Sequence, residues 1–211
     1  LDIIENALKN ARFEMDGVVV RISLSPVIRE QHDEFPMICN HRGQMIVGQF
    51  GSYIPSVVEK FNGDVNEGDI FVWNDPYASK GSISHNNDWC VMMPIFHEKV
   101  LVGFSSIFGH MVDVGGSVPG SMPANARTIW EEGLRVPPVR IYDKGVLNTG
   151  VLDIMLNNSR TPDMNRADLM ALIAGCRTAS TRVRELCDRF GRDTYMTACD
   201  MLLDRTREAM R

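Results

Sequence analysis

The stretch WCVMMPIFHEKVLVGFSSIF, residues 89–108, is typical of an apolar β-hairpin, and the rest of the chain is arranged around it. Two apolar runs of strand length flank a polar turn at residues 97–99. If Phe96 faces Lys99 across this turn, the same register places His85 opposite His110. Directly opposed strand residues have Cβ atoms about 4.5–5.5 Å apart, so we expect the two histidines to lie close together.

Glycine-rich polar segments flank the hairpin: NDPYASKGSISHNND, residues 74–88, precedes it and GHMVDVGG, residues 109–116, follows it. The first contains His85 and Asp88, and the second contains His110 and Asp113. Imidazole nitrogens combined with carboxylate oxygens form a donor set suited to Zn²⁺, Mn²⁺ or Fe²⁺. The pattern predicts a divalent-metal site. The alternative is that these are ordinary loop residues that satisfy backbone groups while the glycines make turns.

The periodicity of the remaining sequence predicts an α+β fold, with a mixed β-sheet core, an N-terminal helix and a C-terminal helical hairpin. The N-terminal helix is expected over residues 2–22, because Pro26 disfavours helix in the residue before it. We expect a charged loop over 27–33 and an irregular segment over 115–138. The other expected elements are strands at 35–39, 44–49, 69–74 and 140–142, and short helices at 53–61 and 151–157.

From Asp163 onward the pattern is purely helical. One apolar stripe ends at Gly191, and Asp193 is a suitable N-cap for a second helix. These helices predict an αα-hairpin packed on the αβ part. The chain therefore divides into a mixed αβ region over 1–160, which carries the predicted metal site, and a helical section over 161–211.

The composition is that of a globular protein: 211 residues, 44% hydrophobic and 23% charged. A net charge of −5 argues against a nucleic-acid partner. No run approaches the roughly 18 apolar residues of a membrane span. The five cysteines are scattered, and we expect buried thiols in a reducing compartment, the cytoplasm. Because the chain starts at Leu1 within a helical pattern, we expect it to be a piece of a longer polypeptide.

Several motifs resemble those of the hydantoinase B/oxoprolinase family. They are SPVIRE at 25–30, NDPY at 74–77, GSISHNND at 81–88, GHMVDVGG at 109–116 and EEGLRVPP at 131–138. They follow the family's order, and the resemblance covers essentially the whole chain. Members of the family are much longer, so the resemblance implies that this chain is an N-terminal portion.

The resemblance implies the metal-bearing subunit of an ATP-dependent enzyme that hydrolyses the C–N bond of cyclic amides, such as hydantoins or 5-oxoproline. The alternative branch is the ATP-dependent carboxylation of ketones, as in the acetone and acetophenone carboxylases. Both branches stay open because residues 80–88 depart from the hydrolases' usual Gly-Gly-Thr-His-Leu-Pro-Asp, and Met111 stands where they usually carry a second histidine. The implied partner is a hydantoinase A-like subunit that binds ATP, so we expect a hetero-oligomer acting on a small-molecule substrate.

The resemblance also implies a ligand set of His, Asp, His and Glu, carried by His85, Asp88, His110 and Glu30, for Mn²⁺ or Zn²⁺. Asp113 is expected to act as a general base or to orient a ligand histidine. For Glu30 the alternative is a surface ion pair, which contributes little. A competing hypothesis is a structural module that docks the ATP-binding partner through residues 115–138 and the helical hairpin, with the chemistry elsewhere.

Overall fold

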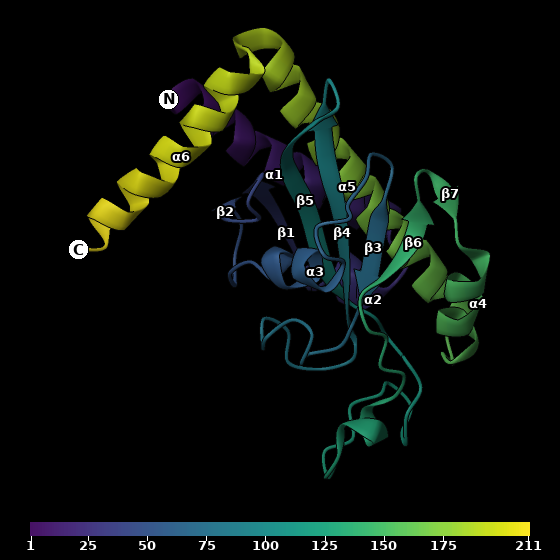
Figure 1. Cartoon of the computed structure of the whole chain (residues 1–211). Helices are drawn as coiled ribbons and strands as arrows, with labels where there is room; N and C mark the ends of the chain where they lie inside the picture. Colours follow the sequence, from purple (N-terminus) through teal and green to yellow (C-terminus); the bar gives the residue numbers. More distant parts are fainter.

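The computed structural model describes residues 1–211 and is built around one antiparallel sheet of seven strands (Figure 1). The strands lie in the order β2-β1-β5-β4-β3-β6-β7. Their bounds are β1 (Glu34–Asn40), β2 (Met45–Val47), β3 (Ile70–Trp73), β4 (Asp88–His97), β5 (Val100–His110), β6 (Val139–Asp143) and β7 (Val146–Leu147). The predicted hairpin, β4 and β5, forms the centre of the sheet.

Helices cover both faces of the sheet, and the predicted α+β fold is confirmed (Figure 1). The long helices α1 (Asp2–Ile22) and α5 (Pro162–Phe190) pack on one face, and the short α3 (Ile54–Lys60) lies on the other. The remaining helices are α2 (Pro26–Arg29), a 3₁₀ turn (Ile129–Glu132), α4 (Thr149–Asn157) and α6 (Arg192–Ala209).

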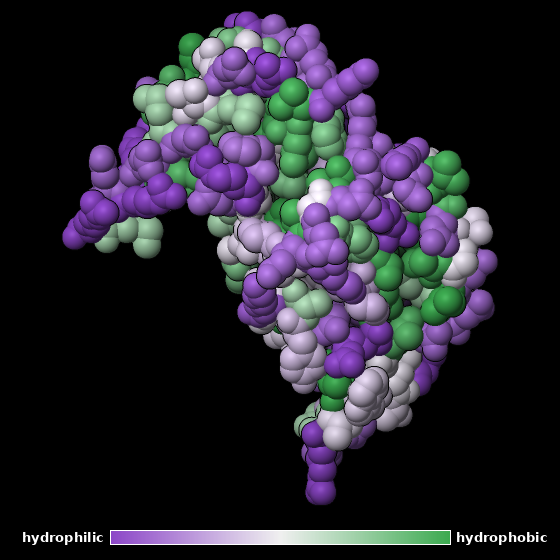
Figure 2. Space-filling model, viewed as in Figure 1, coloured by the Kyte–Doolittle hydropathy of each residue, from purple (hydrophilic) through white to green (hydrophobic).

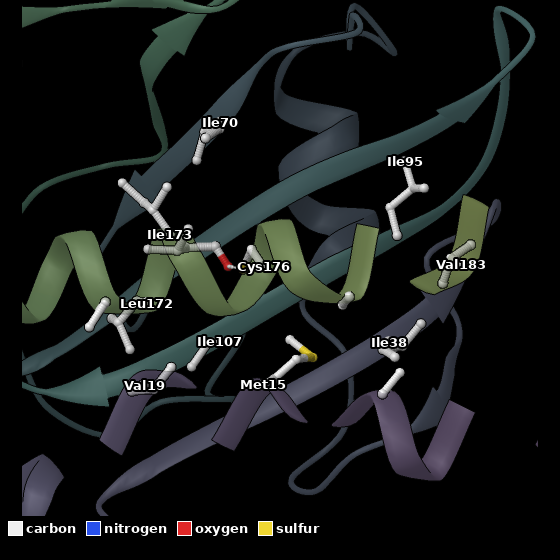
Figure 3. Packing of buried hydrophobic residues seen from close by; sticks show 14 of the residues in the cluster. Met15, Val19, Ile38, Ile70, Ile95, Ile107, Leu172, Ile173, Cys176 and Val183 are labelled. Carbon is white, nitrogen blue, oxygen red and sulfur yellow. Dashed lines mark hydrogen bonds between the residues drawn. The ribbon is translucent and has the colours of Figure 1, made fainter. Parts of the chain in front are cut away.

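The larger core lies between the sheet and the pair α1 and α5 (Figure 3). Met15 of α1 and Leu172 of α5 meet Ile107 of β5 in this layer. At Gly175 an added Cβ would lie 2.6 Å from Cδ1 of Ile107 and 2.8 Å from Cγ2 of Val19, so glycine lets α5 approach both the sheet and α1. The helical section 161–211 thus shares its core with the sheet.

A second, smaller core occupies the opposite face, beneath α3. Tyr53 is fully buried there, with its ring centroid 5.1 Å from that of Trp73. Its hydroxyl lies 2.8 Å from Oγ of Ser106 on β5, which satisfies both buried hydroxyls. The even-numbered residues of β5 from Phe104 to Phe108 face this side. This is the face on which the polar residues at the end of the hairpin gather.

The predicted hairpin register was wrong. His97 pairs with Val100 across a two-residue turn, and a bulge follows between Ile95 and Phe96. The turn residues Glu98 and Lys99 both have positive φ, 49° and 65°, as a two-residue turn that matches strand twist requires. Asparagine and glycine usually signal such a turn, and the sequence has neither here. As a result Asp88, and not His85, lies opposite His110.

The segment expected as a charged loop begins with a short helix, α2. Ser25 is its N-cap, with Oγ accepting a hydrogen bond from the backbone N–H of Ile28, and Pro26 occupies the first turn. Both features favour helix initiation. Residues 30–33 then lead into β1.

Helix α6 extends away from the sheet as an arm (Figure 1). Hydrophilic residues cover most of this arm in the view of Figure 2. Near its C-terminal end, Arg205 forms an ion pair with Glu5 of α1. The arm is therefore tied to the N-terminal helix by charged side chains as well as by the apolar contacts of its first turns.

The five cysteines are free and buried, as predicted. None of the helices combines the length and the apolar character needed to cross a bilayer.

Candidate metal centre

Three predicted ligands converge where the central hairpin meets the preceding loop. Potential ligand atoms of His85, Asp88 and His110 lie within 4.8 Å of one another. Nδ1 of His85 is 3.4 Å from Oδ2 of Asp88, and Nδ1 of His110 is 3.4 Å from Oδ1 of the same carboxylate. The two imidazole rings are nearly perpendicular, with centroids 4.9 Å apart. The carboxylate therefore sits between two imidazoles.

This geometry fits a divalent cation. Two ligands that each lie about 2.1 Å from a tetrahedral ion are about 3.4 Å apart, which matches both separations from Asp88. Nδ1 of His85 is buried and has no hydrogen-bond partner, and a bound cation would remove the cost of that unpaired atom. The side chain of Asp88 is 8% exposed and that of His85 28%, so the group is closed on the sheet side and open beside His85.

Buried amides hold the loop that carries His85. Asn87 donates from Nδ2 to the carbonyls of Met111 (2.8 Å) and Gly120 (3.1 Å). Asn74 donates from its own Nδ2 to the carbonyl of Asn86 at 2.6 Å. These bonds fix the loop against the end of β5. His85 is thus positioned by an amide network, whereas Asp88 and His110 are positioned by the strand ladder.

Asp33 lies beside the group, although the sequence placed it only in a charged loop. Its carbonyl accepts a hydrogen bond from the backbone N–H of His110 at 3.0 Å, which continues the β1–β5 ladder by one residue. Its Oδ2 is 3.8 Å from Nδ1 of His110. Asp33, His110 and Asp88 therefore form one row across three neighbouring strands. The only signal in the sequence was that Asp33 lies two residues before the strand predicted at 35–39.

The structure does not bring Glu30 into the group of three ligands. Glu30 is exposed and occupies the C-cap of α2, where its N–H donates to the carbonyl of Pro26 at 2.9 Å. Only a few residues separate it from Asp33, which touches His110. Its role as a fourth ligand stays a prediction, and that role requires Glu30 itself to turn toward His110.

Asp113 makes a different set of contacts. Its carboxylate accepts hydrogen bonds from the N–H groups of Gly115 (2.9 Å), Gly120 (2.9 Å) and Arg160 (3.0 Å), and from Nη1 of Arg160 (2.9 Å). Burial alone would raise its pKa, but the hydrogen bonds from Arg160 and the two glycines hold the pKa below its usual range. Such a carboxylate is a weak base, and the geometry favours a role in fixing the loop after β5. Catalysis by Asp113 stays a prediction.

Fold and site together define an α+β protein with a candidate metal centre at one end of its central hairpin. The family model described as Hydantoinase B/oxoprolinase matches residues 1–211. The chain belongs to the hydantoinase B/oxoprolinase family, as its motifs predicted.

Relatives in this family include enzyme components of two kinds. The chain is 31% identical over 225 residues to the B component of a putative D-/L-hydantoinase from Pseudomonas sp. (strain NS671), covering 100% of this chain and 38% of the relative. It is 34% identical over 220 residues to the beta subunit of the caprolactamase from Pseudomonas jessenii, covering 100% and 37%. The acetophenone carboxylase delta subunit of Aromatoleum aromaticum is 32% identical over 175 residues, covering 78% and 25%. The chain therefore spans well under half the length of these relatives.

The crystal structure of the ATP-dependent caprolactamase from Pseudomonas jessenii has the same fold. It superposes with a TM-score of 0.87 at 31% identity, covering 99% of this chain and 38% of the other. The overall fold of this chain is thus shared with a solved relative.

Proposed function

We propose that this chain is the metal-bearing part of a subunit that hydrolyses cyclic amides in an ATP-dependent complex. The convergence of His85, Asp88 and His110 around one buried, unpartnered nitrogen carries this proposal. Two relatives, a hydantoinase component and a caprolactamase subunit, supply the reaction class. When bound, a divalent ion such as Mn²⁺ or Zn²⁺ supplies polarisation of a substrate oxygen and a water of lowered pKa.

The protein's own residues prepare the site for a cation. Asp33 and Asp88 flank Nδ1 of His110, so two carboxylates surround the nitrogen that would face the ion. Ligand histidines must be neutral, so cation binding competes with protons and its affinity rises with pH. The exposed side of His85 leaves room for a substrate to reach the group.

We assign the ATP-binding step to a partner subunit. The sequence has no Gly-Lys-Ser/Thr element of a phosphate-binding loop. Two relatives are named as the beta subunit and the delta subunit of their enzymes, which supports a hetero-oligomer. A hydantoinase A-like protein is the partner that we propose.

The test is turnover by the complete protein co-expressed with its partner subunit, supplied with ATP and with hydantoin, ε-caprolactam or 5-oxoproline. We expect ATP-dependent ring opening of at least one substrate. His85→Ala should lower it by about 100-fold or more, as for removal of a catalytic stabilising group. His97→Ala is the matched control, because His97 lies at the other end of β4, about 30 Å away along the strand. Full turnover by His85→Ala would show that the chemistry lies elsewhere and that this section is a docking module.

Ketone carboxylation is the second candidate. The acetophenone carboxylase relative is 32% identical to this chain, about as similar as the hydantoinase relative at 31%. The same complex should therefore also be assayed with acetone or acetophenone, bicarbonate and ATP. Carboxylated product without any ring opening would assign the chain to the carboxylase branch.

A further inference from the structure

Three phenylalanines form a cluster on the sheet face that carries the proposed ligands. Phe35 is on β1, Phe108 is on β5, and Phe50 is on the connection between β2 and α3. The ring centroid of Phe35 lies 4.6 Å from that of Phe50 and 4.8 Å from that of Phe108. Phe108 is 5% exposed, whereas Phe50 is 62% exposed. The cluster is therefore anchored in the sheet and open at Phe50.

The aromatic cluster and the ligand group are neighbours on one face of the sheet. Phe35 and Cys90 lie opposite Phe108 in one row, and Asp88 lies opposite His110 in the next row whose side chains point to the same face. Phe108 and His110 are two residues apart on β5, so their side chains point to the same face, with Cα atoms about 7 Å apart. An apolar surface thus begins two residues along the strand from the proposed cation site.

Phe50 is held in an unusual backbone conformation. Its φ is 65°, in the left-handed region that bulky residues rarely adopt, and such outliers gather at ligand-binding sites. A Cβ on the nearby Gly48 would lie 2.6 Å from Cβ of Met37, so glycine lets the connection lie against β1. The loop therefore places Phe50 over the rings of Phe35 and Phe108 while leaving most of its own surface uncovered.

We propose that Phe50, with Phe35 and Phe108, forms the wall that holds the apolar ring of the substrate, so that Phe50 determines specificity. This inference rests on the proposed function, because the reacting carbonyl must lie at the His85–Asp88–His110 group. From there a hydrocarbon ring reaches the aromatic row. The three phenylalanine side chains carry no polar group, so the wall favours a lactam methylene chain or an aryl substituent over a charged one.

The test compares Phe50→Ala with Phe13→Ala in the complete complex. Phe13 is the matched control, since it is 64% exposed and belongs to α1, on the other face of the sheet. For Phe50→Ala we expect KM to rise about tenfold for ε-caprolactam and 5-phenylhydantoin. We expect KM for unsubstituted hydantoin, kcat and the metal content to stay nearly unchanged, and Phe50→Leu to restore part of the affinity. Equal KM values in wild type and Phe50→Ala, or the same rise for every substrate, would overturn the inference and leave the proposed function intact.

If the wild-type complex opens no cyclic amide, the proposed function has failed. A second measurement then tests the aromatic wall by itself. Saturation-transfer NMR with ε-caprolactam and acetophenone reports contact with the protein without any turnover. Transfer to the ring protons by wild type that is lost in Phe50→Ala supports the wall. Equal transfer in the two proteins would overturn the inference. A change of assembly size in Phe50→Ala would also overturn it, because it would show that the cluster packs against another protein surface.

Discussion

Nδ1 of His85 is a buried polar atom that the protein leaves without a partner. Buried polar groups are almost always hydrogen-bonded, so an exception either binds a ligand or costs free energy of folding. Asp88 offers its two oxygens to two different imidazoles, and neither separation, at 3.4 Å, is a hydrogen bond. A cation between these groups would satisfy all three residues at once.

Asp113 illustrates how a predicted catalytic residue can have a structural explanation. Replacing it by asparagine removes a charged acceptor from its hydrogen bonds with Arg160, Gly115 and Gly120. Hydrogen bonds to charged groups contribute about 1.5–3 kcal/mol each, and the amide oxygen of asparagine still accepts part of them, so we expect Asp113→Asn to lower the free energy of unfolding by about 2–3 kcal/mol in total. Urea denaturation at pH 7 measures this.

The lowered pKa of Asp113 predicts that the stability of the fold depends on pH. The folded-state pKa of Asp113 lies below its ordinary value of 3.8, so the carboxylate stabilises the fold fully above about pH 4 and less as the pH falls through the folded pKa. The stability difference between wild type and Asp113→Asn should therefore shrink below about pH 4. Unchanged stability combined with lost turnover would instead identify Asp113 as the catalytic base.

Among the secondary-structure elements, the position of the central hairpin could be predicted from the sequence, but its register could not. Apolar alternation located β4 and β5, whereas the turn depended on positive φ at Glu98 and Lys99, which their side chains do not favour. The predicted register placed His85 opposite His110, whereas the observed partner of His110 is Asp88. His85 still reached the group because buried asparagines fix its loop. Asp33 was missed because only the pairing of β1 with β5 brings it to His110.

The contact between β1 and α1 contains a buried carboxyl group, Glu34, that should respond to pH. Burial, and then the nearby charges of Asp16 and Asp33, raise its pKa to about 7. In the range from its ordinary value of 4.5 to about 7, the folded state binds more protons than the unfolded state, so stability falls as pH rises. A rise of this size corresponds to about 3 kcal/mol.

We therefore expect Glu34→Gln to become progressively more stable than wild type between pH 5 and pH 8, by up to about 3 kcal/mol. Arg12 of α1 opposes this effect, because it favours the charged carboxylate. Urea denaturation of both proteins across this range is the measurement. A constant difference between them would mean that Glu34 ionises at its ordinary pKa.

Across the whole molecule, the two faces of the sheet differ in what covers them. One face is sealed by α1 and α5 over a continuous apolar core (Figure 3). The other carries α3, the aromatic cluster and the three proposed ligands. Helical periodicity predicted the sealed face well, because it depends on regular elements. The open face depends on loops whose hydrogen bonds join distant residues such as Asn74 and Leu134, and local sequence does not encode those contacts.

The proposed function requires His85, Asp88 and His110 to hold one divalent ion. The metal content of the complete protein after loading with Mn²⁺ or Zn²⁺ and gel filtration, measured by inductively coupled plasma mass spectrometry, tests this. We predict about one ion per chain in wild type and in the His97→Ala control, and a loss of most of it in His110→Ala and Asp88→Asn. Glu30→Gln, measured alongside, tests the fourth ligand. Metal content in His110→Ala equal to that of wild type, with the fold intact, would show that these three residues do not hold the ion.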